Sequence, residues 1–126
     1  MRYLLDSTVL IDHAQGLPAA VDLVRSLFSE PNDLLICDVV VTETLSKGPD
    51  DEIAVIGRLI DALEYVAMDP DAARWAGASR RRGGRTSPRT VSDALIAGVA
   101  WSFDATVVTR NPKDFEAQGI PVLTYG

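Results

Sequence analysis

The chain has 126 residues, with one cysteine, Cys37, and one histidine, His13. A lone cysteine cannot form an internal disulfide, and too few Cys and His residues exist for a structural zinc site. A single histidine also excludes acid–base catalysis by a pair of histidines. These absences favour chemistry that depends on carboxylates and a metal ion.

Long apolar runs are also missing. No segment approaches the roughly 18 apolar residues of a membrane helix, and the first run, residues 1–5, reaches Asp6 too early for a signal peptide. Apolar residues make up 47% of the chain and charged residues 24%, which favours a compact core over disorder. We expect a soluble, cytoplasmic protein with one domain, residues 1–126, and no membrane partner.

Positive charge is scarce overall, since the net charge is −6, and this alone argues against nucleic-acid binding. Its distribution indicates something different. Half of the ten arginines fall within ten consecutive positions: Arg80, Arg81, Arg82, Arg85 and Arg89. Such a segment can bind a polyanion locally. It can equally be a solvated helix end whose cations interact favourably with the helix dipole.

Apolar runs typical of strands alternate with helical spacing along the chain. Strands are expected at residues 2–5, 34–41, 65–68, 105–109 and 121–125, and helices at residues 19–28, 42–48, 50–63, 72–82 and 90–103. This alternation predicts an α/β fold, a three-layer α/β/α sandwich with a mostly parallel central sheet.

Acidic residues occupy corresponding places in this pattern. Asp6 follows the first strand, Glu43 is expected after the second strand at a helix start, and Asp93 opens an apolar helix. Asn111 and Asp114 follow the strand at 105–109. Because parallel strands end at one edge of the sheet, these side chains are expected to gather there.

Carboxylates that close together repel one another. At about 5 Å and an effective dielectric constant of about 20, each pair costs roughly 3 kcal/mol. A divalent cation removes this cost, and oxygen ligands favour Mg²⁺ or Mn²⁺. The residues alone leave a second interpretation open, in which each acid only caps a helix.

Four segments are similar, in the same order, to those that define the PIN domain family. The first acid lies in residues 5–12, the second in 41–43 and the third in 92–97, while residues 108–115 (Val-Thr-Arg-Asn-Pro-Lys-Asp-Phe) resemble the fourth segment. Together they span nearly the whole chain. The small size and the fourth segment look most like the VapC toxins of this family.

The resemblance implies a Mg²⁺- or Mn²⁺-dependent endoribonuclease that hydrolyses RNA phosphodiester bonds. It implies a toxin of a type II toxin–antitoxin system, a homodimer inhibited by a VapB-like antitoxin. Asp6, Glu43 and Asp93 would be catalytic metal ligands. The fourth position is either Asn111 or Asp114, and the number of metal ions, one or two, stays open. The candidate contacts to RNA are Arg80, Arg81, Arg82, Arg85 and Arg110, although a carboxylate partner for Arg110 is as plausible.

Three alternatives to this interpretation make different demands on the sequence. A receiver-like Mg²⁺-binding signalling domain needs an adjacent acidic pair after the first strand, whereas Ser7 follows Asp6. A haloacid-dehalogenase-type phosphatase needs Asp-x-Asp, and Thr8 stands at the third position. A catalytically inactive PIN-like binding module is consistent with the same motifs, and metal binding separates it from an enzyme.

Overall fold

The computed structural model describes residues 1–84 and 89–126 and contains one five-stranded parallel sheet. The strands lie in the order β3-β2-β1-β4-β5, so β1 is central and pairs with β2 and β4. The predicted parallel sheet is confirmed. The strand bounds are β1 Arg2–Leu5, β2 Asp33–Cys37, β3 Glu64–Val66, β4 Thr106–Val108 and β5 Val122–Leu123.

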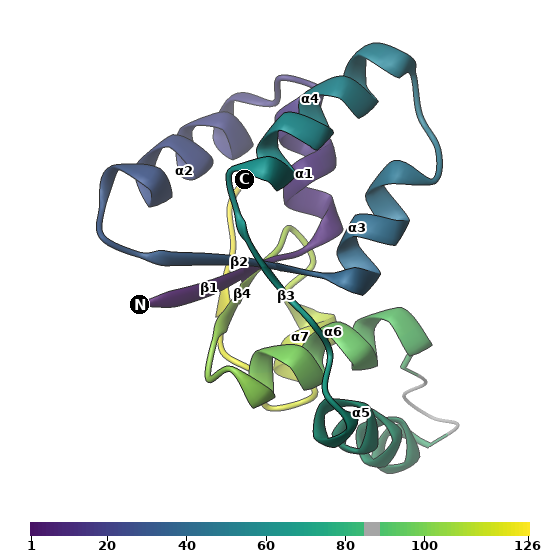
Figure 1. The fold of residues 1–126 in the computed structure, drawn as a ribbon. Helices are drawn as coiled ribbons and strands as arrows, with labels where there is room; N and C mark the ends of the chain where they lie inside the picture. The colour runs from purple at the N-terminus through teal and green to yellow at the C-terminus, as the bar shows by residue number, and fades with distance from the viewer. Residues whose placement is uncertain (85–88) are drawn as a thin grey trace.

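Helices cover both faces of this sheet (Figure 1). One layer holds α1 (Ser7–Ala14), α2 (Pro18–Ser29), α3 (Asp38–Leu45) and α4 (Asp50–Asp61), and the other holds α5 (Pro70–Gly83), α6 (Val91–Ser102) and α7 (Lys113–Glu116). The predicted three-layer α/β/α sandwich is therefore confirmed. None of the helices in residues 1–84 and 89–126 has the length and apolar character that spanning a bilayer requires.

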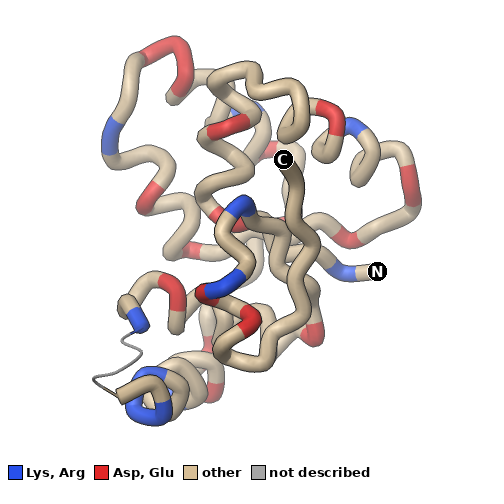
Figure 2. Tube along the Cα trace, turned by 180° about the vertical axis from the view of Figure 1, so that it is seen from behind, with Lys and Arg blue, Asp and Glu red and all other residues tan. Residues whose placement is uncertain are grey.

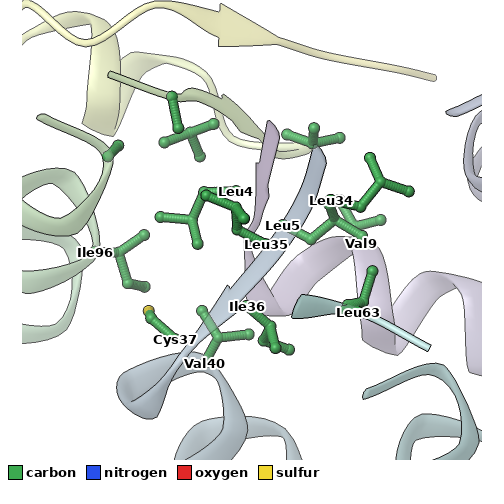
Figure 3. Packing of buried hydrophobic residues seen from close by; sticks show 14 of the residues in the cluster. Leu4, Leu5, Val9, Leu34, Leu35, Ile36, Cys37, Val40, Leu63 and Ile96 are labelled. Atoms are coloured by element: carbon green, nitrogen blue, oxygen red, sulfur yellow. The ribbon is translucent and has the colours of Figure 1, made fainter. Parts of the chain in front are cut away.

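The core lies on both sides of the central strands (Figure 3). Leu4, Leu5 and Ile36 are fully buried, and Leu35 nearly so. Consecutive residues of a strand point to opposite faces, and helices cover both faces here, so an uninterrupted apolar run is what these strands need. The polar residue that follows such a buried apolar strand therefore lies at the rim of the core.

Helix α6 lies very close to α5 because Gly98 has no side chain. A Cβ atom at position 98 would come within 2.4 Å of the carbonyl oxygen of Ala72. The N-terminus of α6 is fixed by Thr90, whose hydroxyl accepts a hydrogen bond from the backbone N–H of Asp93 at 3.1 Å. Close packing and the cap together set where Asp93 stands.

The expected strand at residues 34–41 is wrong in its second half. Strand β2 ends at Cys37, and Asp38 begins α3. Three consecutive valines, residues 39–41, favour a strand locally, yet Val40 is fully buried in a helix because packing outweighs a weak local preference. Glu43 is consequently well inside α3, and the residue before this helix is Cys37, not Thr42.

Candidate active site

Asp6 lies at the middle of the carboxyl edge of the sheet. It follows β1 directly and occupies the N-cap position of α1. Its backbone N–H donates to the carbonyl of Val108 at 2.9 Å, which ties it to the end of β4. The residue is only 5% exposed. A carboxylate at this depth is fixed in place by two neighbouring strands.

Hydroxyl groups surround the Asp6 carboxylate. Thr109 Oγ1 donates to Asp6 Oδ2 at 2.8 Å, Thr8 Oγ1 donates to the same oxygen at 3.3 Å, and Ser7 Oγ donates to Oδ1 at 3.5 Å. Burial raises the pKa of Asp6, and these hydrogen bonds partly offset that effect.

Thr109 belongs to the site although it was not singled out from the sequence. It is fully buried directly after β4, and its hydroxyl also accepts from the backbone N–H of Asn111 at 3.0 Å. A polar residue directly after a buried strand was the available signal. Thr109 thus links Asp6 to the segment that bears Asn111.

Glu43 enters the site from α3 and is half-buried. Its Oε1 atom is buried and accepts no hydrogen bond from the residues that the structure describes. Burial raises the pKa of Glu43, the charges of Asp6 and Asp93 raise it further, and Ser92 lowers it. An unpaired buried carboxylate oxygen is costly unless a cation or a proton compensates it.

Asp93 enters the site from the first turn of α6 and is half-buried. Burial raises the pKa of Asp93, and the charges of Asp114 and Asp6 act in the same direction. The charge effects on Glu43 and Asp93 show that four carboxylates, from four segments of the chain, lie near one another. We refer to Asp6, Glu43, Asp93 and Asp114 as the acidic site.

The acidic site is not a closed ligand cage. Within residues 1–84 and 89–126, no three His, Cys, Asp or Glu side chains are gathered closely enough to hold one ion as they stand. Its chemistry nevertheless fits Mg²⁺ or Mn²⁺, because every donor is oxygen and Glu43 Oε1 has no partner among the residues placed by the structure. The carboxylates must therefore move closer together to hold one ion.

A pocket of about 380 Å³ adjoins the acidic site. Its lining comprises residues 110–114, and both candidates for the fourth position, Asn111 and Asp114, lie exposed on its wall. Two cations, Arg110 and Lys113, share this wall. The pocket therefore joins the acidic site to positive charge, and the sequence did not draw attention to Lys113.

Arg110 has a carboxylate partner. Its Nη1 atom lies 2.9 Å from Oδ1 of Asp12, a buried residue of α1. The hydroxyl of Tyr125 donates to the other oxygen of Asp12 at 2.7 Å. Sequence patterns do not show which carboxylate is the partner, because Asp12 and Arg110 are 98 positions apart. Half of the Arg110 side chain stays exposed at the pocket.

The first three arginines of the run at residues 80–89 lie at the end of α5, where Figure 2 shows positive charge concentrated. Arg80, Arg81 and Arg82 are exposed. The Arg82 guanidinium lies 5.8 Å from the centroid of the Trp75 ring. Arg85 lies outside the described residues. The three described arginines therefore present their charges to solvent at one helix end.

Arg89 differs from the other arginines because it turns inward. It donates to the carbonyl and the hydroxyl of Ser79 and, at 2.8 Å, to the carbonyl of Ala117. Since Thr90, the cap of α6, follows it directly, Arg89 holds the end of α5 beside the start of α6. Its observed role is structural.

Comparison with known proteins places this geometry in a family. The sequence model of the PIN domain matches residues 3–120. Ribonuclease VapC19 of Mycobacterium tuberculosis (strain ATCC 25618 / H37Rv) is 32% identical over 114 residues, which cover 89% of this chain and 90% of the relative.

Two solved structures show the same architecture. VapBC2 from Rickettsia felis, bound to a DNA fragment from their promoter, superposes with a TM-score of 0.85 at 20% identity, covering 100% of both chains. DNA-bound VapBC from Salmonella typhimurium gives a TM-score of 0.82 at 26% identity, covering 98% of each chain.

Proposed function

The chain belongs to the PIN domain family, and on that premise we propose that it is a Mg²⁺- or Mn²⁺-dependent endoribonuclease that hydrolyses RNA phosphodiester bonds. The observation that carries the proposal is the acidic site. There Glu43 presents, beside Asp6 and Asp93, a buried oxygen that has no hydrogen-bond partner in the described part of the chain. The ribonuclease VapC19, a relative over most of the chain, supports RNA as the substrate.

Asp6, Glu43 and Asp93 would hold the metal ion, with Asn111 or Asp114 at the fourth position. A divalent cation in such a site activates water and stabilises the negative charge that develops on the phosphoryl group. The site favours an ion because burial raises the pKa of all three principal carboxyls, and the charges of neighbouring carboxylates raise the pKa of Glu43 and Asp93 further.

The chain's own residues prepare the site before any ion binds. The hydroxyls of Thr109 and Thr8 hold the Asp6 carboxylate in one orientation. The buried strand ends exclude water beneath it, which strengthens electrostatic interactions at the reacting centre. Thr109 also accepts a hydrogen bond from the backbone N–H of Asn111. One hydroxyl therefore orients both Asp6 and the backbone of the segment that bears the fourth position.

RNA would bind through local positive charge. The chain carries a net charge of −6, so most of its surface repels a polyanion. Arg110 adjoins the acidic site, and Arg80, Arg81, Arg82 and Arg85 would contact phosphates farther along the strand. Binding should therefore be strongly salt-dependent and confined to one face.

In the cell, we propose that this single domain acts in the cytoplasm as the toxin of a type II toxin–antitoxin system. Its partners would be a VapB-like antitoxin and a second copy of itself in a homodimer. Support comes from the VapC relative and from the VapBC structure of Salmonella typhimurium. Family membership sets aside the receiver and phosphatase alternatives and leaves only an inactive PIN module.

Cleavage of total cellular RNA and of a single-stranded oligomer tests the proposal. We expect cleavage with Mg²⁺ or Mn²⁺, none in EDTA, and none by Asp6→Asn or Asp93→Asn. The matched control is Asp22→Asn, which makes the same charge change in an exposed residue of α2 and should cleave normally. Cleavage in EDTA, or full activity of Asp6→Asn, would overturn the assignment.

The fourth position needs its own comparison. Asn111→Ala and Asp114→Asn each remove one candidate ligand from the pocket wall. The variant that raises the Mn²⁺ concentration needed for half-maximal cleavage identifies the ligand. The other variant should change RNA affinity at most.

A further inference from the structure

Asp12 is a buried charge next to the acidic site that the proposed catalysis does not use. Its side chain is 4% exposed, and it stands on α1. Both of its oxygens are engaged, Oδ1 by Arg110 Nη1 at 2.9 Å and Oδ2 by the Tyr125 hydroxyl at 2.7 Å. The cluster therefore joins three segments of the chain that are distant in sequence.

Arg110 is held at both of its ends. Its backbone N–H donates to Thr8 Oγ1 at 3.0 Å, and its guanidinium is held by Asp12. A guanidinium has five N–H donors, and the bond to Asp12 uses one of its nitrogens. With 52% of the side chain exposed on the pocket wall, donors remain for a second anion.

We propose that Asp12 and Tyr125 are positioning residues that hold Arg110 so that the pocket of residues 110–114 binds a backbone phosphate of single-stranded RNA beside the acidic site. The inference rests on the proposed function and deepens it. Lys113, on the same wall, is the second cation of this subsite.

Electrostatic repulsion explains why a fixed cation is needed beside the acidic site. The carboxylates of the acidic site repel RNA, so a fixed cation next to them offsets that repulsion where the strand must approach. An arginine that is already ordered loses less conformational freedom on binding than a mobile one. The planar guanidinium also suits phosphate geometry.

The direction in which Asp12→Asn changes RNA affinity distinguishes a positioning role from a general charge effect and from sequestration of Arg110. The substitution removes one negative charge, so a general charge effect strengthens RNA binding. If Asp12 merely sequestered Arg110, its removal would also strengthen binding. Only a positioning role predicts weaker binding.

The experiment measures binding of a labelled single-stranded RNA oligomer to the full chain by fluorescence anisotropy, at low salt in EDTA, so that cleavage plays no part. We expect Arg110→Gln to weaken binding about tenfold and Asp12→Asn about three- to tenfold. For Arg110→Gln, the slope of log Kd against log salt concentration should be about 0.7 smaller than for the wild type. This difference is the contribution of one phosphate contact on a single strand.

Matched controls come from the exposed pair on α2. Asp22 and Arg25 lie 3.5 Å apart, far from the pocket in sequence, and Asp22→Asn and Arg25→Gln make the same charge changes. Neither should weaken RNA binding more than about twofold. An equal loss in Arg25→Gln would show that only net charge matters and would overturn the inference.

Tyr125→Phe keeps the test decisive if Asp12→Asn does not fold. It removes only the hydroxyl that binds Asp12, and we expect about two- to threefold weaker RNA binding. Unchanged or tighter binding by a folded Asp12→Asn, unchanged binding by Tyr125→Phe, or no binding by the wild type overturns the inference. A different result, intact RNA after incubation with the wild type and Mn²⁺, would overturn the proposed function.

Discussion

Asp6→Asn should stabilise the metal-free protein while abolishing its response to divalent cations. Asp6 is almost completely buried, and burial raises its pKa. Its charge also acts on Glu43 and Asp93, after burial itself, to raise their pKa values. At neutral pH the Asp6 charge is therefore unfavourable to folding until a cation binds.

The magnitude follows from Coulomb's law. A charge pair at about 6 to 8 Å, with an effective dielectric constant of about 20 to 40, costs about 1 to 3 kcal/mol. The amide keeps one oxygen for the Thr109 hydroxyl but replaces the other, which offsets about 1 kcal/mol. The net gain in EDTA is up to about 2 kcal/mol, or up to roughly 8 °C in Tm.

Thermal unfolding in EDTA and in excess Mn²⁺ measures both effects. At an ion concentration of about a hundred times Kd, a bound ion adds about 2.7 kcal/mol to the wild type, so the order of stability should reverse. Asp22→Asn, the exposed control, should respond to Mn²⁺ like the wild type. A less stable Asp6→Asn in EDTA would show that the Asp6 charge does not destabilise the metal-free protein. Equal Mn²⁺ shifts in the wild type and Asp6→Asn would show that Asp6 is not a metal ligand.

Three further predictions concern packing, pH and the arginines. Gly98→Ala should cost about 2 to 4 kcal/mol in unfolding free energy, because its Cβ meets the Ala72 carbonyl; Gly77→Ala, with open space, should gain up to about 1 kcal/mol. In EDTA, the Tm of the wild type relative to that of Asp6→Asn should rise as pH falls from 7 towards 5, because burial raises the pKa of Asp6 and the folded wild type takes up this proton before the unfolded chain does; a difference that does not rise contradicts this. Arg89→Met should lower Tm, whereas Arg81→Gln should weaken RNA binding at unchanged Tm.

Much of the fold could be predicted from the sequence because long apolar patterns dominate it. The strand at residues 2–5 and the helices α2, α4, α5 and α6 lie close to where periodicity predicts them. The boundary between β2 and α3 could not be predicted, because the valines after Asp38 favour a strand locally. Helix α7, with four residues, is too short to leave a periodic pattern.

Part of the candidate site could also be predicted from the sequence. The rule that parallel strands end at one edge directed attention to Asp6 and Asp93, which end or begin buried elements. Asp12 could not be found this way, since it lies in mid-helix and its partners Arg110 and Tyr125 are remote in sequence. Such pairs are set by tertiary packing, which single-sequence patterns do not encode.

Asp6, Glu43 and Asp93 are expected to converge on one divalent cation. Anomalous diffraction from crystals of the wild-type protein grown with Mn²⁺ would reveal this ion. We expect one strong peak about 2.1 Å from carboxylate oxygens of all three residues, and no such peak in Asp6→Asn. Saturating Mn²⁺ with no peak within reach of these three residues would show that they do not share a cation.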